Sequence, residues 1–463
     1  MMTTGLDKFE RDGKKIISLL HQKGFVGYFV GGYVRNKLLG LNSDNLDIAT
    51  SALPTEVISI LSKAGIKTKD IGIKYGTILA ITNSIPIEIT TFRSERGYSD
   101  KRHPDKVLYL SNYKQDAKRR DFTINALYFD PITSQMFDPG GGKADLKNKI
   151  IRFIGKPSER IKEDPLRLIR AIRIATQLGF ALEKKTMAEI IKHSNLILEV
   201  PGERIKQELD KILLSENWLR GIRLLDELSL VNKILPEVSS MKDYYHGSKK
   251  YHLEGNLWAH TLLAMEKLNS SDLDLNYALL FHDIGKVKVG KPKLKEEGWV
   301  MSSVGHEAAS TEMFLQIAKR LRFSRSSAKL VSWGIGSHGL RTPFIRDMKL
   351  INKIKLALHP DFPFLLQLWK ADSMANIKLI NGKAEIPKPM AYTEGLNLLS
   401  AIKEKTILIN KLANGHAIKK IIKTKNDPII GRIRLLLIEK IILGAIKKQK
   451  DSEKLIKKFT KKA

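Results

Sequence analysis

The strongest constraint on the fold is a change in hydrophobic period partway along the chain. Up to about residue 150, short β-rich runs alternate with segments of helical period, and we expect strands at 25–30, 46–49, 77–82 and 85–92 and helices at 34–39 and 55–64. From about Asp164 the period becomes helical and remains so to the end. The sequence therefore predicts an α/β N-terminal domain followed by an all-α region.

A chain of 463 residues is long enough for about three domains. Breaks in the helical pattern at 241–256, in the Lys- and Gly-rich loop 289–298 and at 386–389 subdivide the second half. We expect four parts, with bounds at 1–150, 151–240, 241–380 and 381–463.

The charge balance predicts a polyanionic partner. The 80 Lys and Arg exceed the 49 Asp and Glu and give a net charge of +31. Nucleic acid fits best, because cationic side chains gain affinity by releasing phosphate counterions. The alternative is that the protein comes from a generally basic proteome.

The absence of cysteine excludes disulfide scaffolds, thiolate nucleophiles and iron–sulfur clusters, so any metal must be held by His, Asp or Glu. No stretch approaches the roughly 18 apolar residues of a membrane span. We expect a cytoplasmic protein without a membrane partner.

The run from Phe29 to Arg35 predicts a phosphate-binding turn. Gly31 and Gly32 stand where a strand passes into a helix, and Arg35 follows within the first turn. Glycine lets backbone amides approach a phosphate, the helix N-terminus favours anions, and an arginine can bind two phosphate oxygens. The alternative is a plain tight turn.

Acidic residues on neighbouring strands complement that turn. Asp47 shares a strand face with Asn45, and Glu88 lies on a later strand. Carboxylates that converge beside a phosphate site can hold Mg²⁺ for phosphoryl transfer. Each acid taken alone could equally be an exposed strand residue.

Two further motifs contain the residues expected at a nucleotide. Arg119, Arg120 and Asp121 form the first motif, and Glu163 to Arg173 form the second. In the second, Asp164 precedes three arginines spaced by three, which we expect on one helical face: Arg167, Arg170 and Arg173. An aspartate that accepts and an arginine that donates can together bind the Watson–Crick edge of a base. The alternative is a solvated ladder of ion pairs.

With these motifs in this order, the sequence resembles the bacterial-type (class II) CCA-adding tRNA nucleotidyltransferases and the related poly(A) polymerases. The resemblance implies a nucleotidyltransferase domain of the polymerase beta type at 1–150 and a helical base-recognition and RNA-binding part at 151–240. It also implies catalytic Asp47, Asn45 and Glu88, with Mg²⁺ at Asp47. The nucleotide-binding residues would be Gly31, Gly32, Arg35, Arg120, Asp164, Arg167, Arg170 and Arg173.

The sequence departs from the family at two positions. Asn45 and Asn36 stand where the family has acids, and an amide oxygen binds a cation more weakly than a carboxylate. Asp44 could substitute only through a local bulge. Residues 94–104 also resemble the flexible loop of members that add the terminal A.

An ordered set of histidines and aspartates marks the second half. It comprises His260, the adjacent His282 and Asp283, His306, His338 and Asp372, all offering nitrogen or oxygen ligands. The set resembles the HD phosphohydrolase domain, here at 241–380. The resemblance implies one divalent metal (Mn, Ni, Fe, Zn or Mg) at His260, His282, Asp283 and Asp372. His306 and His338 would add a second metal or meet the phosphate.

The sequence thus predicts an enzyme that adds C, C and A to tRNA 3′ ends from CTP and ATP, with a basic helical tail at 381–463 contacting tRNA. Two alternatives stay open. One is an RNA-binding HD-domain phosphohydrolase with an impaired transferase site, and the other is a polymerase that adds poly(A) or a single A.

Overall fold

The computed structural model describes residues 6–83, 85–245, 252–295, 298–380, 382–422 and 427–460. These residues form two compact units, Met1–Ile234 and Leu235–Ala463, each of which is described by itself. Lys461 and Lys462 of the expected basic tail lie outside the described residues. Among the described helices, none has the length and apolarity needed to cross a bilayer.

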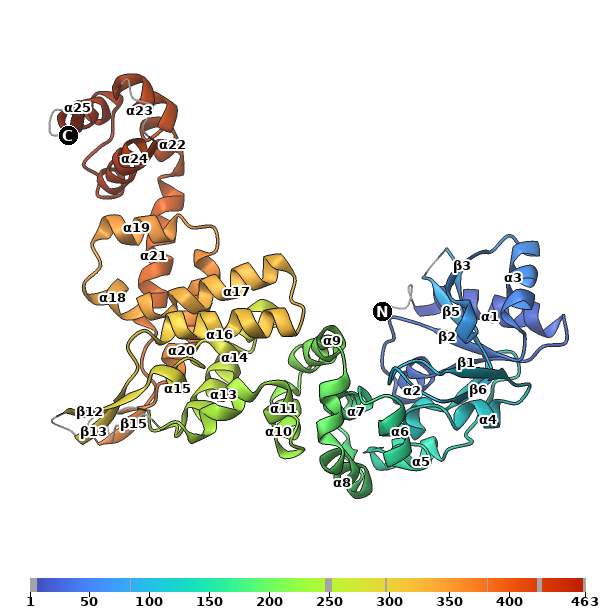
Figure 1. Cartoon of the computed structure of the whole chain (residues 1–463). Coiled ribbons are helices and arrows are strands. Elements are labelled where there is room, and N and C mark those ends of the chain that lie inside the picture. Colours follow the sequence, from blue (N-terminus) through green and yellow to red (C-terminus); the bar gives the residue numbers. More distant parts are fainter. Residues whose placement is uncertain are drawn as a thin grey trace. The chain divides into compact units, whose positions relative to one another are not determined.

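The first unit is built on a mixed sheet whose described strands follow the order β3-β4-β5-β2-β1-β8-β9. Figure 1 labels β1, β2, β3 and β5 of this sheet. Their bounds are β1 Gly27–Val30, β2 Asp47–Thr50, β3 Lys67–Gly72, β4 Thr77–Ile81, β5 Ile87–Thr91, β8 Tyr128–Asp130 and β9 Gln135–Phe137. β2 and β5 run parallel, and the other neighbours run antiparallel. The four expected strands and both expected helices are confirmed.

Helices cover this sheet because each presents one apolar stripe. In α1 (Leu6–His21), Ile16, Ile17 and Leu20 are fully buried. The helix α2 (Gly32–Leu39) follows β1 directly, and α3 (Pro54–Lys63) connects β2 toward β3. The short turns at these strand ends position the side chains of the candidate site.

The rest of the first unit contains a hairpin and a helical region. The hairpin pairs β6 (Arg93–Arg96) with β7 (Lys106–Tyr109), and β10 (Ile150–Ile151) pairs in parallel with β11 (Ala181–Leu182). The helices are α4 Tyr113–Ala117, α5 Gly142–Asn148, α6 Pro157–Glu163, α7 Arg167–Leu178, α8 Lys184–Lys192, α9 Gly202–Leu213, α10 Trp218–Glu227 and α11 Val231–Ile234. The 3-10 helices are η1 Ile73–Tyr75, η2 Thr123–Asn125 and η3 Ser194–Glu199.

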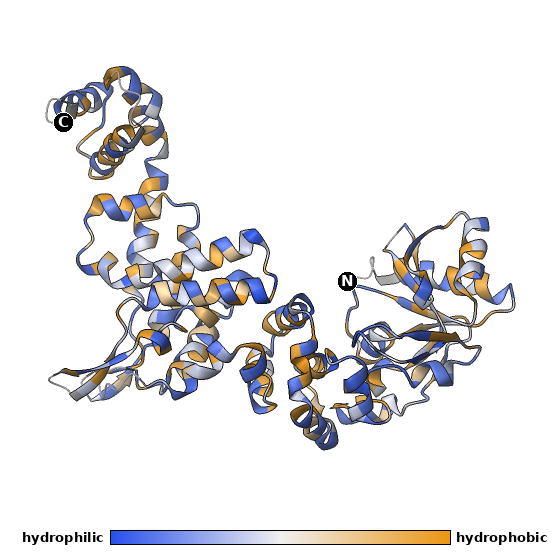
Figure 2. Cartoon of the chain, in the orientation of Figure 1, coloured by the Kyte–Doolittle hydropathy of each residue, from blue (hydrophilic) through white to orange (hydrophobic). Residues whose placement is uncertain are grey.

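The second unit is mainly helical, and hydrophobic and hydrophilic residues alternate along its helices (Figure 2). Its helices are α12 Pro236–Ser239, α13 Leu257–Leu268, α14 Leu273–Phe281, α15 Lys286–Val289, α16 His306–Arg320, α17 Arg325–Ser337, α18 Arg341–Arg346, α19 Leu350–Ala357, α20 Phe362–Ala375, α21 Met390–Glu404, α22 Thr406–Leu412, α23 Gly415–Ile422, α24 Asp427–Ile442 and α25 Gln449–Thr460, with the 3-10 helices η4 Ser240–Asp243 and η5 His338–Leu340. The predicted α/β domain and helical region are thus confirmed.

The expectation that everything after Asp164 is helical is wrong at three places. β11 pairs with β10, β12 (Lys291–Lys295) forms a hairpin with β13 (Gly298–Ser302), and β14 (Lys378–Ile380) forms another with β15 (Lys383–Glu385). The expected loop at 289–298 is therefore largely strand. The many lysines of this segment obscured the alternation of side chains that is typical of a strand. Leu294 on one strand stands opposite Trp299 on the other.

Candidate active site and candidate metal centre

A cavity of about 520 Å³ opens on the sheet of the first unit. It is lined by the β1–α2 turn, by β2 and β5, and by the segments around Arg120 and Asp164. Of the expected site residues, the lining includes Gly31, Gly32, Asp47, Glu88, Arg120, Asp164, Arg167 and Arg170. Asn45, Arg35 and Arg173 are not among the lining residues.

The β1–α2 turn needs glycine at its first position. Gly31 has φ +72°, in the left-handed region, and a Cβ there would lie 3.3 Å from Oδ2 of Asp47. Gly32 then begins α2 without an acidic residue in the first turn. The first amides of this helix therefore border the cavity and the Asp47 carboxylate and favour an anion.

Asp47 and Glu88 form a carboxylate pair through strand register. β2 and β5 are parallel neighbours, and Asp47 stands directly opposite Glu88. Burial, followed by the charge of Glu88, raises the pKa of Asp47 to about 6, although Arg120 and Arg170 act in the opposite direction. Two adjacent carboxylates that repel each other in this way fit a divalent cation, because the positive charge of the cation would offset the repulsion between them.

Asn45 lies outside this pair. It is exposed and precedes the first residue of β2 by two positions, and Asp44 beside it is also exposed. The pairing of β2 with both neighbours is regular from Asp47 to Thr50, and Asp44 and Asn45 precede the paired residues. The structure thus brings Asp47 and Glu88 together and leaves Asn45 apart.

Arg35 connects two elements behind the turn. Its Nε and Nη2 donate to Oδ1 of Asn36 over 3.0 and 2.8 Å, and its Nη1 donates to Oδ1 of Asn125 over 2.8 Å. Burial and the charge of Arg173 lower the pKa of Arg35 to about 10. Arg35 therefore holds α2 against η2, where Asn125 borders the cavity.

The Arg-Arg-Asp motif is organised by a buried aspartate that the sequence interpretation missed. Asp116 Oδ1 lies 2.8 Å from Arg119 Nε, and its Oδ2 accepts from Arg120 Nη2 at 3.1 Å and from the Tyr128 hydroxyl at 2.7 Å. Although burial opposes ionisation, Arg119 and Arg120 lower the pKa of Asp116. Its spacing of three and four residues before the arginines was a usable signal.

Asp121, the third residue of this motif, holds another arginine at the cavity. Its Oδ2 lies 2.7 Å from Nε of Arg170, and its Oδ1 accepts from Nδ2 of Asn125 over 3.1 Å. Both Arg120 and Arg170 therefore present positive charge near Asp47.

Asp164 and Arg167 both line the cavity with fixed side chains. Arg204 of α9 donates two parallel hydrogen bonds to the Asp164 carboxylate, over 3.1 and 3.0 Å. Nη1 of Arg167 donates to Glu163 over 2.7 Å. Arg204 is a second residue that the sequence interpretation missed, because it lies 40 residues from its partner.

Arg173 points elsewhere and pairs with Glu208 over 2.6 Å. The geometry of the α-helix explains this difference. Each residue turns about 100° around the helix axis, so a residue three positions later lies roughly 60° away around the axis. Arg167 and Arg173 are two such steps apart and therefore point in directions that differ by about 120°. The expected single face therefore holds for neighbours in the series but not across all three arginines.

The β6–β7 hairpin, part of the expected flexible loop, borders the same cavity. Tyr98, Arg102, His103 and Pro104 are among the lining residues. The His103 ring stacks on Tyr75 with centroids 5.1 Å apart, and Glu95 binds both Arg93 and Arg119. Tyr75 belongs to no motif of the sequence, and Glu95 lies in the 94–104 loop but was not singled out.

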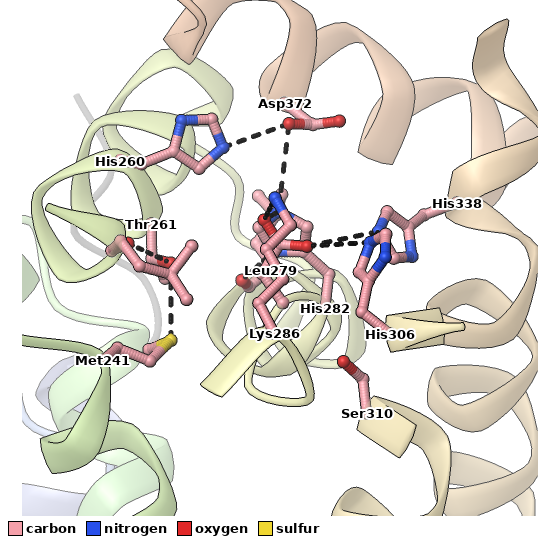
Figure 3. Close-up of polar contacts among 12 residues, drawn as sticks. Met241, His260, Thr261, Leu279, His282, Lys286, His306, Ser310, His338 and Asp372 are labelled. Carbon is pink, nitrogen blue, oxygen red and sulfur yellow. Dashed lines mark hydrogen bonds and ion pairs between the residues drawn. The ribbon is translucent and has the colours of Figure 1, made fainter. Parts of the chain in front are cut away.

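The second unit brings together all of the expected metal-ligating residues (Figure 3). Asp372 Oδ1 lies 3.1 Å from His260 Nε2 and 3.9 Å from His282 Nε2. Asp283 lies 3.2 Å from His282 Nε2, 3.3 Å from His306 Nε2 and 3.4 Å from His338 Nε2. Helices α13, α14, α16, α17 and α20 supply or directly flank these residues.

Each histidine ring is oriented in the same manner. In each of the four histidines, Nδ1 donates a hydrogen bond to an oxygen over 2.6 to 2.8 Å. His260 donates to the Glu254 carboxylate. His282, His306 and His338 donate to the backbone carbonyl oxygens of Leu279, Ser303 and Ile335, respectively. This bond favours the tautomer in which the lone pair of Nε2 can bind a metal. Glu254 was not singled out from the sequence, because it precedes the first histidine by six residues with no recognisable motif.

Two buried atoms of this cluster fit a divalent cation. Nε2 of His282 and Oδ1 of Asp283 are buried and have no hydrogen-bond partner of suitable geometry. Although burial opposes ionisation, His282 and Lys286 hold the pKa of Asp283 well below its usual value. Imidazole nitrogens and ionised carboxylates suit the divalent metals expected here.

A cavity of about 270 Å³ opens onto this cluster. Its lining includes Asp283, His306, His338 and Asp372, together with the cations Lys286 and Arg341. Nζ of Lys286 lies 2.7 Å from Asp283, and Nη1 of Arg341 also binds Asp372. A phosphate at the mouth would therefore meet both a metal and fixed positive charge.

Two family models match the first unit and its border. Residues 27–152 match the poly A polymerase head domain, and residues 179–242 match the probable RNA and SrmB-binding site of polymerase A. The CCA-adding enzyme of Streptococcus uberis is 38% identical over 257 residues, which are 54% of this chain and 62% of that protein. The CCA-adding enzyme of Ligilactobacillus salivarius is 43% identical over 217 residues, which are 47% of this chain and 52% of that protein. The chain thus spans less than two thirds of these relatives.

Solved structures share the fold across almost the whole chain. The CCA-adding enzyme of Bacillus stearothermophilus in complex with CTP has a TM-score of 0.70 at 23% identity, covering 100% of this chain and 99% of that one. The Thermotoga maritima CCA-adding enzyme complexed with tRNA has a TM-score of 0.64 at 17% identity, covering 98% and 96%.

Proposed function

We propose that the protein is a member of the family of poly(A) polymerases and CCA-adding tRNA nucleotidyltransferases, and that it adds C, C and A to the 3′ end of tRNA. One observation carries the proposal: the Asp47–Glu88 pair, the Gly31–Gly32 turn and the Asp164–Arg167 pair all line one cavity. A cation site, a triphosphate site and a base-reading pair thus lie within reach of one nucleotide.

The chain's own residues place the triphosphate. The first amides of α2, at Gly31 and Gly32, face the anion, and Arg120 and Arg170 supply positive charge. Mg²⁺ bound at Asp47 and Glu88 would supply charge neutralisation and activation of the attacking hydroxyl. The tRNA 3′ oxygen forms a bond to the α-phosphorus, the bond from that phosphorus to the bridging oxygen breaks, and pyrophosphate leaves.

Asp164 and Arg167 are proposed to select the base. Cytosine and adenine both present an exocyclic amino group, which a carboxylate can accept, beside a ring acceptor that an arginine can bind. Uracil and guanine present a carbonyl oxygen at the position of that amino group and would oppose the Asp164 carboxylate. The bidentate bond from Arg204 holds the carboxylate in place.

A net charge of +31 suits tRNA as the polyanionic partner. The proposed substrate would also place the reaction in the cytoplasm.

The test uses tRNA lacking CCA and tRNA ending in CC, with labelled CTP or ATP and Mg²⁺, resolved at single nucleotides. The proposal expects C, C and A on the first tRNA and a single A on the second. Long A tracts, A alone on both substrates, or no incorporation would contradict it.

A second candidate function, phosphoester hydrolysis, rests on the buried, unpartnered His282 Nε2 and Asp283 Oδ1. His260, His282, Asp283 and Asp372 would hold a divalent metal, which supplies Lewis-acid chemistry for hydrolysis when bound. Lys286 and Arg341 would bind the phosphate. The purified protein should release phosphate from RNA ends with a terminal phosphate, or open a 2′,3′-cyclic phosphate to a phosphomonoester. A metal-free preparation that shows neither activity after metal addition would contradict this function.

A further inference from the structure

The strand register places the phosphate turn and one edge of the sheet on opposite sides of the carboxylate pair. Val30, the last residue before that turn, stands opposite Asp47, and Asp47 stands opposite Glu88. Glu88 in turn stands opposite Leu79 of β4, whose other neighbour is β3. Neighbouring strands lie about 4.8 Å apart. The larger cavity therefore runs across the sheet from the β1–α2 turn, over the carboxylate pair, to the segment β3–η1–β4, which contributes Ile71, Gly72, Tyr75 and Thr77 to its lining.

Nucleotide addition uses both sides of the carboxylate pair. With the triphosphate at the β1–α2 turn, pyrophosphate leaves toward that turn. The attacking oxygen lies roughly in line with the leaving oxygen, on the opposite side of the α-phosphorus. The RNA 3′ end therefore approaches from the side of β3, η1 and β4.

The segment 97–105, which connects β6 to β7, borders the cavity on this side. Its His103 ring stacks on Tyr75 of η1 with the ring planes 7° apart. Oδ2 of Asp100 lies 2.6 Å from Nδ1 of His103. Oδ1 of Asp100 accepts from the backbone N–H groups of Arg102 and His103 over 2.9 and 2.7 Å. The backbone at Arg102 is thus fixed by Asp100, and the ring beside it is fixed by Tyr75.

A second contact joins this segment to the helical part of the same unit. Nζ of Lys101 lies 3.7 Å from Oε2 of Glu199, the last residue of η3. The pair is partly exposed and stabilises the segment little, but it shows that the segment extends from η1 to η3. Arg102 lies between these two contacts.

Arg102 differs from the other arginines of the cavity because it has no acidic partner among the described residues. Its side chain is exposed and is part of the lining. Each of the other lining arginines forms an ion pair with a carboxylate: Arg93 with Glu95, Arg119 and Arg120 with Asp116, Arg167 with Glu163, and Arg170 with Asp121. The guanidinium of Arg102 is therefore available to a phosphate, to which it can donate two parallel hydrogen bonds.

In addition to the nucleotide addition proposed above, and resting on it, we propose that Arg102 binds a backbone phosphate of the single-stranded tRNA 3′ end. Tyr75 and His103 are positioning residues, because their stack holds the segment that carries Arg102. An RNA phosphate is favoured over the triphosphate of the incoming nucleotide because Asp47 and Glu88 lie between the β1–α2 turn and the segment β3–η1–β4. A tRNA ending in CC has two more backbone phosphates in its single-stranded end than a tRNA lacking CCA, so the contact should matter more for A addition.

Steady-state kinetics with an RNA hairpin that copies the acceptor stem and ends in CC test Arg102 against two substrates. Arg102→Ala should raise KM for this RNA at least tenfold and leave KM for ATP within twofold, and Arg102→Lys should recover part of the loss. The control, Lys106→Ala, removes an exposed cation at the start of β7 that does not line the cavity, and both KM values should stay unchanged. A raised KM for ATP with an unchanged KM for the RNA would overturn the proposal in favour of a triphosphate contact.

Uncharged linkages identify the phosphate. A methylphosphonate is placed at each of the last three linkages of the RNA hairpin in turn, and binding to the full-length protein is measured by fluorescence anisotropy without nucleotide. One of these linkages should weaken binding by the wild type about tenfold. The same linkage should have little further effect on Arg102→Ala, because the contact is already lost. Equal losses for the two proteins at every linkage would contradict the proposal.

Two variants of Tyr75 test the positioning role. In Tyr75→Ala the backbone amides of 97–105 should exchange hydrogen at least tenfold faster, and KM for the RNA should rise about fivefold while kcat stays within twofold. Tyr75→Phe keeps the aromatic ring and should restore both values. Unchanged exchange in Tyr75→Ala would contradict the positioning role of the stack.

Equilibrium binding separates this inference from the function on which it rests. If the wild type adds no nucleotide but Arg102→Ala binds the RNA hairpin at least tenfold more weakly, the transferase function fails and the Arg102 contact stands. If the wild type adds C, C and A while Arg102→Ala binds and extends the RNA normally, the transferase function stands and the proposed contact is wrong.

Discussion

Asp47 is a carboxylate that the fold holds where ionisation is costly. Its register partner is Glu88, and burial and that neighbouring charge together raise its pKa to about 6. A residue selected for stability alone would not stand there, since a neutral side chain would avoid both penalties. The position is therefore best explained by a cation that binds the pair.

The first prediction concerns Asp47→Asn without metal. The folded chain disfavours the ionised form, so the variant should unfold at a temperature several degrees higher at pH 8, from a gain on the order of 2 kcal/mol. The gain should shrink below pH 6 and vanish near the ordinary carboxyl pKa of 3.8. Calorimetry from pH 4 to 8 measures it.

Mg²⁺ should then stabilise the wild type but not Asp47→Asn. The matched control is Asp44→Asn, which neutralises an exposed carboxylate three residues away and should change neither the melting temperature nor the Mg²⁺ response. A melting temperature of Asp47→Asn below that of the wild type at pH 8 would contradict the inference that the ionised Asp47 carboxylate destabilises the metal-free protein.

The second prediction concerns Arg204, a positioning residue for Asp164. Arg204→Ala removes two charge-assisted hydrogen bonds and frees the carboxylate to rotate. We expect the preference for CTP over UTP, measured as the ratio of kcat/KM values, to fall about tenfold. Arg204→Lys should restore part of it, and Lys206→Ala on the same helix should leave the ratio unchanged. A uniform loss of kcat with an intact ratio would indicate a merely structural role.

Elements were predictable where their own sequence contained the signal. The strands β1, β2, β4 and β5 are short apolar runs bounded by turn residues, and all four were predicted. β3 was missed because its residues are largely exposed and polar, and β8 and β9 because they have only three residues each. In addition, β8 pairs with β1, which lies far away along the chain, and periodicity does not reveal such pairing.

The third prediction concerns the β6–β7 hairpin. Arg102 and His103 border the cavity from this element, and the loop resembles that of members that add the terminal A. Replacing 98–104 by two glycines should reduce A addition to tRNA ending in CC at least tenfold, while C addition changes about twofold. Single-turnover assays with each tRNA measure both steps.

The control for the loop replacement shortens a turn of the seven-stranded sheet in the same unit. Replacing 131–134, between β8 and β9, by Asn-Gly should leave both steps unchanged. Equal losses of C and A addition after the 98–104 replacement would mean that the hairpin supports the whole cavity.

The chain as a whole contains two candidate sites, one in each compact unit. Their key residues were recognisable from motifs, because glycine turns, paired acids and ordered histidines have characteristic spacing. Arg204 and Glu254 were not, because each acts through another side chain and belongs to no motif, whereas the spacing of Asp116 before Arg119 and Arg120 was a signal that the interpretation did not use. Asn45 and Arg173 show the converse: a motif position does not ensure a place at the cavity.

The fourth prediction is that the two sites can be disabled separately. Asp283→Asn should strip most bound transition metal from the full-length protein and abolish phosphate release, because this carboxylate lies near three histidines. CCA addition should remain within about twofold of the wild type. Elemental analysis and the two activity assays measure this, with His359→Ala as a control outside the cluster. Unchanged metal content would refute the assigned ligands.

The central claim is that Asp47 and Glu88, without an acid at position 45, hold the catalytic cation beside the nucleotide. Crystals of the full-length protein soaked with CTP and Mn²⁺ test it most directly through anomalous scattering. The account predicts an anomalous peak bound by both carboxylates, with the triphosphate at the Gly31–Gly32 turn. A cavity without a peak, or a Mn²⁺ ion bound away from this pair, would contradict it.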